Sequence, residues 1–333
     1  VRYFWSGVEL MSMMQMLLGT SSGGGGPNVS DVYSTDTYSG DSAQTRTITN
    51  GIDLSGEGGL VWLKSRSAAE RSAVFDSERG VAKVLSTVDK TIESTENYMS
   101  SFNSNGYTLS TSDNRINGSG KTYVTWSFRQ AAKFFDCIKY TGNGSTQNIS
   151  HSLDATPGFI ITKPLALTKN WHCWHSAINT DQYFTLDTTD GINNNDDLWN
   201  DTAPTSSQFS VGNNSATNAS GQEYIAYLFA EDTSNVIKCG SYTGTGSGNH
   251  TITTGFEVQW VLIKKGGTGF ADWILVDSAR GANKVLYPSD SKAEDTSTTV
   301  MQEFTSNGFK LGADSDVNEN NVEYIYVAIA AES

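Results

Sequence analysis

The strongest constraint on the fold is a set of sequence markers that recurs three times in the same order. A Tyr-Ser/Thr-Gly tripeptide begins at Tyr38, Tyr140 and Tyr242, at intervals of 102 residues. Later in each copy an apolar run ends in a lysine (60–64, 159–163 and 260–264), and each copy closes on an aromatic run (123–128, 224–229 and 324–329). Self-similarity at a fixed period indicates a repeated structural unit. The sequence therefore predicts three copies of one unit.

Each copy alternates short runs of β-branched and aromatic residues with Gly- and Asn-containing turns, as at 104–106 and 306–308. This pattern is typical of sandwiches with many short strands. We predict an all-β fold of three tandem β-sandwich, jelly-roll-like repeats of about 100 residues with an N-terminal arm. The predicted boundaries are 1–35 for the arm and its Gly-rich linker, 36–132 for copy 1, 133–232 for copy 2 and 233–333 for copy 3.

The closing runs are apolar at nearly every residue, so these strands are expected to be covered on both faces. The links between copies are short, at 130–135 and 231–236. Short links restrict the motion of neighbouring domains. We therefore expect the copies to stack as a semi-rigid rod.

Charge and hydropathy exclude two classes of partner. The net charge is −14 and the basic residues form no stripe, so nucleic acid is not an expected partner. No segment reaches the roughly 20 apolar residues of a membrane span, so no membrane insertion is expected. The three cysteines are too few, and odd in number, for a disulfide framework. We expect them to be reduced, as suits assembly in a bacterial cytoplasm.

The N-terminal segment is apolar and rich in methionine. Glu9 lies inside the apolar run and no clean cleavage site follows, which argues against a signal peptide. We predict instead an assembly or docking arm, formed by Met11, Met13, Met14, Met16, Leu17 and Leu18.

Two kinds of sequence feature are candidates for ligand binding. Trp199 and Asp201 lie in a polar stretch, where an aromatic face can stack on a sugar or fold back as a lid on the core. The second feature is an Asp-x-x-Arg-Gly turn, which occurs in copy 1 as Asp76 and Arg79 and in copy 3 as Asp277 and Arg280. Its simplest interpretation is a local ion pair closed by a positive-φ glycine, and the alternative is a polar sugar-binding corner.

Two segments are weighed as metal sites. Asp314, Asp316 and Asn318 alternate like the start of a calcium loop, but Glu319 and Ile325 stand where such a loop needs Gly and Glu. A solvated turn is expected, with a weak calcium site as the alternative, and no other cofactor. His172-Cys-Trp-His175 carries potential ligands, but side chains alternate along a strand, so His172 and His175 should face opposite sides.

Several motifs resemble an uncharacterised repeat-domain family of tail-fibre-like structural proteins of marine and other bacterial viruses. The resemblance covers roughly residues 36–331, and its clearest segments are 135–142, 199–204 and 224–230. It implies a virion protein that assembles with other virion proteins and forms a homo-oligomer, of which a trimer is one form. It brings no catalytic residues with it.

From this resemblance we expect a tail fibre or appendage that binds a glycan or protein on the host surface. The protein would assemble in the bacterial cytoplasm and reside on the extracellular mature particle. No Ser-His-Asp or Cys-His arrangement stands out at a recognisable spacing, so no enzyme activity is expected. The alternatives are a capsid decoration or tail scaffold protein with an assembly role only, and a carbohydrate-active enzyme or bacterial adhesin.

Overall fold

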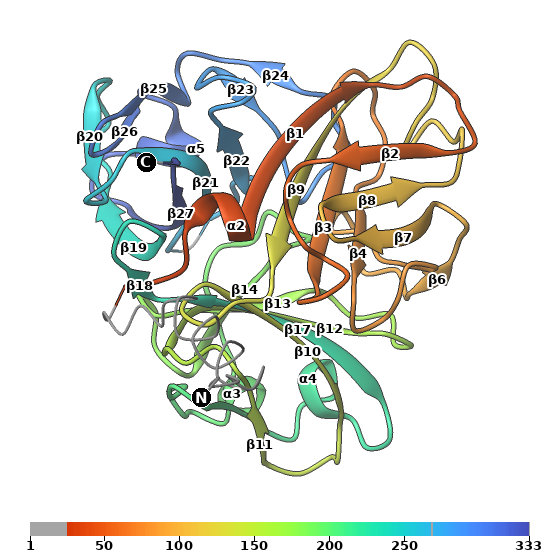
Figure 1. Cartoon of the computed structure of the whole chain (residues 1–333). Coiled ribbons are helices and arrows are strands. Elements are labelled where there is room, and N and C mark those ends of the chain that lie inside the picture. Colours follow the sequence, from red (N-terminus) through yellow and green to blue (C-terminus); the bar gives the residue numbers. More distant parts are fainter. Residues whose placement is uncertain (1–24, 268, 333) are drawn as a thin grey trace, which may run out of the picture.

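Antiparallel β-strands form most of the part of the chain that the computed structural model describes, residues 25–267 and 269–332 (Figure 1). The all-β prediction is confirmed. Within these ranges the helices are single turns: α2 (Val29–Val32), α3 (Asp196–Trp199), α4 (Ser215–Asn218) and α5 (Ser315–Asn318). The predicted docking arm, from Met11 to Leu18, lies outside the described residues.

Three large sheets share one strand order. The first sheet has the order β1 (Tyr33–Ser39), β9 (Thr122–Arg129), β3 (Gly59–Ser65), β4 (Ala73–Asp76). The second has β10 (Phe135–Thr141), β17 (Glu223–Ala230), β12 (Pro157–Pro164), β13 (His172–His175), β14 (Gln182–Thr185), β15 (Asn193–Asn194). The third has β18 (Asp232–Thr233), β19 (Ile237–Thr243), β27 (Glu323–Ala330), β21 (Val258–Lys265), β22 (Ile274–Asp277). In each sheet the closing aromatic run lies between the strand that opens the copy and the strand that carries the lysine.

Smaller sheets accompany the large ones. They are β2 (Arg46–Thr49), β8 (Gly106–Leu109) and β7 (Met99–Asn103); β11 (Gln147–Ser150) and β16 (Gln208–Val211); and β20 (His250–Thr253), β26 (Gly308–Leu311) and β25 (Met301–Thr305). Two short ladders complete the set, β5 (Lys83–Val84) with β6 (Ser94–Thr95) and β23 (Lys284–Val285) with β24 (Asp295–Thr296). The small sheets of copies 1 and 3 each have a third strand, β7 and β25. In copy 2 the corresponding part of the chain forms α3 and the turn after it.

The alternation of side chains along the strands divides the core. On β3, Val61 and Leu63 face a cluster that includes Tyr107 of the small sheet, whereas Leu60 and Trp62 face a second cluster. This second cluster is continuous through all three copies. The central strand β27 is buried from Tyr324 to Ala330, so the expectation that the closing strands are covered on both faces holds there.

The three copies meet around a common centre, where aromatic rings from different copies pack together. Phe128 of copy 1 lies 5.6 Å from Phe229 of copy 2 and 5.7 Å from Trp260 of copy 3, measured between ring centroids. Phe159 of copy 2 lies 6.0 Å from Trp273 of copy 3. Each copy thus contacts both others, and Figure 1 shows three lobes around one middle.

The prediction of a rod is therefore wrong. Strands that are apolar on both faces need a cover for their second face, and here the other two copies provide it. The division into three sandwich domains, with boundaries after residues 132 and 232, stays a prediction. Cys137, Cys173 and Cys239 are buried free thiols. In residues 25–267 and 269–332, no helix combines the length and apolar character needed to cross a membrane.

Candidate functional site

The Asp-x-x-Arg turns predicted from the sequence are buried ion pairs. Arg79 Nε lies 2.5 Å from Asp76 Oδ2, and Arg280 Nε lies 2.6 Å from Asp277 Oδ2. All four side chains are at most 1% exposed. Gly80, which closes the first turn, has φ +89°. The interpretation as a local ion pair closed by a positive-φ glycine is confirmed, and neither pair lies where a sugar could reach it from solvent.

These pairs also join the copies to one another. The hydroxyl of Tyr227 in copy 2 donates to Asp76 in copy 1 at 2.7 Å. The indole Nε1 of Trp126 in copy 1 donates to Asp277 in copy 3 at 2.9 Å. Hydrogen bonds to a buried carboxylate are among the stronger ones in proteins. The two turns therefore fix how neighbouring copies are oriented.

In copy 2 a histidine replaces the aspartate and makes the contact with the neighbouring copy. His175 stands at the position of the two aspartates, and its Nε2 lies 3.1 Å from the backbone oxygen of Tyr326 in copy 3. Its Nδ1 accepts a hydrogen bond from the backbone N–H of Ala177, so Nε2 carries the proton. Burial lowers the pKa of His175 to about 4. The ring is therefore neutral near pH 7.

Three buried lysines reinforce the boundaries between copies. Each donates from Nζ to a backbone oxygen of the neighbouring copy: Lys64 to Asp290 at 2.6 Å, Lys163 to Lys90 at 3.1 Å and Lys264 to Thr189 at 3.0 Å. Desolvation lowers the pKa of each of these lysines to about 8. They are the lysines that end the recurring apolar runs, so the sequence marker identifies an interface residue.

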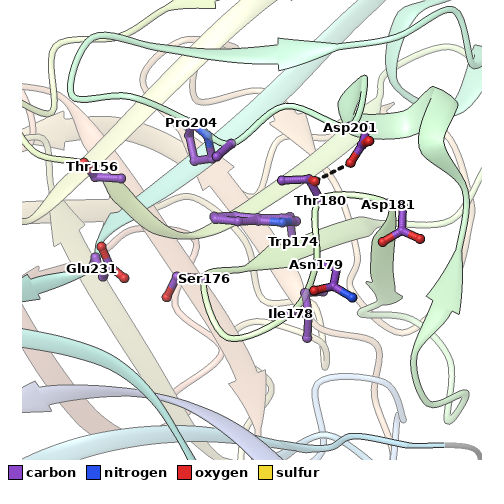
Figure 2. Close-up of a pocket in the computed structure, with 11 residues that line it drawn as sticks. Thr156, Trp174, Ser176, Ile178, Asn179, Thr180, Asp181, Asp201, Pro204 and Glu231 are labelled. Carbon is purple, nitrogen blue, oxygen red and sulfur yellow. Dashed lines mark hydrogen bonds between the residues drawn. The ribbon is translucent and has the colours of Figure 1, made fainter.

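The candidate binding site is a cleft in copy 2. It lies beside the turn in which His175 and Ile178 replace the Asp and Arg of the other copies. It has a volume of about 650 Å³. We call it the Trp174 cleft (Figure 2). Its lining residues are Thr156, Trp174, Ser176, Ile178, Asn179, Thr180, Asp181, Asp201, Ala203, Pro204 and Glu231.

Two loops form opposite walls of the Trp174 cleft. One is the turn after β13, which begins where copies 1 and 3 have their Asp-Arg turns and carries Ile178 at the arginine position. The other follows α3, where Asn200 and Asp201 have φ values of 55° and 42°. The hydroxyl of Thr180 donates to Asp201, which ties the two loops together (Figure 2). This hydrogen bond holds the two walls of the cleft together.

The lining of the Trp174 cleft combines an aromatic side chain with hydroxyl, amide and carboxylate groups. Its acidic members are Asp181, Asp201 and Glu231, and no lysine, arginine or histidine is among the described lining residues. Trp174 is 6% exposed. Such a surface can bind a polar ligand through its hydroxyl or amino groups.

The ligand-binding candidates from the sequence overlap with the lining of this cleft only in part. Asp201 is among the residues that line the cleft, whereas Trp199 is not among them and packs in the shared core with 2% of its surface exposed. Ligand binding by Asp201 stays a prediction. Trp199 is thus the lid on the core, the second of its two interpretations. The tryptophan of the cleft is Trp174, which lies in the segment His172–His175, a candidate metal motif in the sequence. The alternation that places His175 in the interface places Trp174 on the other face, and that signal could have identified it.

The acidic loop of copy 3 has structural partners. Asp314 caps α5 by accepting a hydrogen bond from the backbone N–H of Asp316 at 3.0 Å. Asn318 is fully buried, and its amide donates to the backbone oxygen of Gly312 at 2.6 Å. Among the described residues no group of three or more His, Cys, Asp or Glu side chains could hold a metal ion. The calcium site stays a prediction.

Comparison with known proteins gives a family whose function is unknown. No curated protein matches the chain. Residues 28–333 match the model of one family, described as a domain of unknown function, DUF7483. That match covers all three copies and most of the chain, so this protein belongs to the DUF7483 family.

Proposed function

We propose that the protein is a non-catalytic structural component of a bacterial virus particle, a tail fibre or appendage that binds the host surface. The resemblance of residues 36–331 to tail-fibre-like proteins gives the context. The Trp174 cleft gives a surface on which a host glycan can be held.

The observation that carries this proposal is the locked arrangement of the three copies. Each of their boundaries is crossed by a buried polar contact, made by Tyr227 to Asp76, by Trp126 to Asp277 and by His175 to Tyr326. A buried polar group is satisfied only in one geometry, so these contacts oppose sliding of one copy on another. A rigid scaffold lowers the entropic cost of binding. Several such chains in one particle multiply weak contacts.

The test is to locate the protein and to remove it. Particles of a virus whose genome encodes this chain are labelled with an antibody against it and viewed by electron microscopy. We expect label on an appendage, and at least a tenfold loss of adsorption in particles that lack the protein. Absence of label from particles would overturn the proposal. Label on the capsid with normal adsorption would also overturn it, in favour of a decoration protein.

A second function, a carbohydrate-active enzyme, is favoured by the three carboxylic acids of the Trp174 cleft. Glycoside hydrolysis uses two carboxyl groups on either side of the scissile bond. The purified chain is incubated with host-surface polysaccharide, and reducing ends are measured. We expect none above the blank. Release of reducing ends that is lost in Asp181→Asn or Asp201→Asn would replace the binding function by a hydrolytic one.

A further inference from the structure

The Trp174 cleft carries a second conclusion, about the chemistry of its ligand. The cleft exists where copy 2 departs from the other copies. Copies 1 and 3 fill the region of the turn with a buried network in which the arginine also faces a glutamate, Glu93 at 3.4 Å and Glu294 at 3.1 Å. Copy 2 has Ile178 in place of the arginine and Ile192 in place of the glutamate. The ionic network is absent there, and the turn after β13 lines an open cleft instead.

The charge of the cleft restricts the ligand. Asp181, Asp201 and Glu231 are part of the lining, which includes no basic side chain within the described part of the chain. The whole protein also carries −14. An acidic ligand, such as a uronic acid or a phosphorylated sugar, would be repelled at short and at long range. A ligand with an amino group would instead be attracted.

The remaining lining groups suit a sugar ring. Trp174, Ile178 and Pro204 supply apolar surface, against which the C–H faces of a sugar can pack. Trp174 also has a buried indole N–H without a hydrogen-bond partner among the described atoms. Thr156 and Asn179 add hydrogen-bonding groups that match hydroxyls. Aromatic and polar groups are thus gathered in one cleft of about 650 Å³, a size typical of small-ligand sites.

We propose that the Trp174 cleft binds an amino-sugar unit of a host-surface saccharide, with the amino group held by the carboxylates of Asp181 and Asp201, which lie at the end of the cleft away from Glu231, and the ring packed on Trp174 (Figure 2). This inference rests on the proposed function, because it names the ligand of the surface that contacts the host. An ammonium group beside carboxylates forms charge-assisted hydrogen bonds. The interaction is open to solvent, so added salt weakens it.

The test uses the full chain and three tetrasaccharide probes in calorimetry: glucosamine, its N-acetylated form and galacturonate. We expect the glucosamine probe to bind at least tenfold more tightly than the N-acetylated probe, and galacturonate not to bind. Raising the salt from 50 to 500 mM should weaken the glucosamine affinity several-fold. Equal affinity for all three probes, or no binding of glucosamine, would overturn the inference.

Variants assign the binding to the cleft. Asp181→Asn and Asp201→Asn remove one charge each and should each weaken glucosamine binding at least fivefold. Glu303→Gln makes the same change in copy 3 at a side chain that is 58% exposed, and should leave binding unchanged. Trp174→Ala should abolish binding, and Trp174→Phe, which keeps a ring in the core, covers the case in which the alanine variant fails to fold. Unchanged affinity in both Asp variants would contradict the assignment.

The two proposals can fail separately. If the chain binds glucosamine but is absent from virus particles, the proposed virion function is wrong and the proposed ligand still holds. If the chain lies on an appendage but binds none of the three probes, the proposed virion function still holds and the proposed ligand is wrong.

Discussion

The hydroxyl of Tyr227 donates to the carboxylate of Asp76 at 2.7 Å, and so joins the central strand of copy 2 to the edge strand β4 of copy 1. Asp76 also binds Arg79, so one buried carboxylate serves both its own turn and the next copy. The two interactions together make this carboxylate a junction between copies.

Tyr227→Phe should therefore destabilise the protein, because it leaves a buried carboxylate with one donor fewer. We expect a loss of about 1–3 kcal/mol in the free energy of unfolding, measured with urea. Tyr242→Phe is the matched control, since Tyr242 donates at 2.7 Å to the neutral backbone oxygen of Val317 inside copy 3. The control should lose about 1 kcal/mol. A Tyr227 variant as stable as the control would contradict the role of the charged acceptor.

The ion pair of copy 3 should behave as a coupled unit. Arg280→Met leaves Asp277 and Glu294 without this cation, and we expect a loss of about 3–5 kcal/mol. The double variant Arg280→Met with Asp277→Asn also removes a buried negative charge, so it should be more stable than Arg280→Met alone. Urea unfolding of the four proteins gives the coupling energy. Additive losses would show that the two side chains act independently.

Acid should weaken the contact between copies 2 and 3. The pKa of His175 is about 4 in the folded protein and about 6.5 in an unfolded chain, so the unfolded chain binds the proton first. The contribution of the neutral ring is complete above pH 6.5 and is lost as the pH falls toward 4. Between pH 7 and 4.5 the wild type should lose about 2–3 kcal/mol more than His175→Gln, whose amide does not titrate. Equal losses in the two proteins would contradict this prediction.

Mild alkali should have the opposite effect through the buried lysines. The pKa of Lys264 is about 8 in the folded protein and about 10.4 when exposed, so the unfolded chain holds the proton longer. The cost of burying the charge disappears as the pH rises from 8 toward 10. We expect stability to rise by about 1–2 kcal/mol more in the wild type than in Lys264→Met over this interval. The readout is the change with pH, because the methionine also removes the hydrogen bonds to Thr189 and Ala271.

The strand content could be predicted from the sequence, because it is local. The runs that end at Lys64, Lys163 and Lys264 became β3, β12 and β21, and the aromatic runs became central strands. The arrangement of the three copies around a common centre could not be predicted in this way. The local sequence does not distinguish a strand face that is covered by its own copy from one that is covered by another copy. The residues around Phe128 therefore do not indicate that Phe128 packs against Phe229 and Trp260.

The cleft illustrates the same limit. Asp201 is a candidate from the sequence because it lies in an unusual polar stretch, whereas Trp174 is an ordinary strand residue until another loop approaches it. Two signals point there: the alternation along the strand, which places Trp174 on the face opposite His175, and the comparison of the copies. Copy 2 has His175 and Ile178 where copies 1 and 3 have the Asp and Arg of their turns, and Ile178 is one of the residues that line the cleft.

The pairing of Arg66 with Glu294 joins side chains 228 positions apart, from the first copy to the last. A ribosome releases the N-terminal part of a chain long before the C-terminal part exists. The faces of copy 1 that carry Trp126 and Phe128 therefore stay without their covers during most of synthesis. This chain should finish folding late and in a single closing step, and the half-made polypeptide should be the form that most needs protection from aggregation.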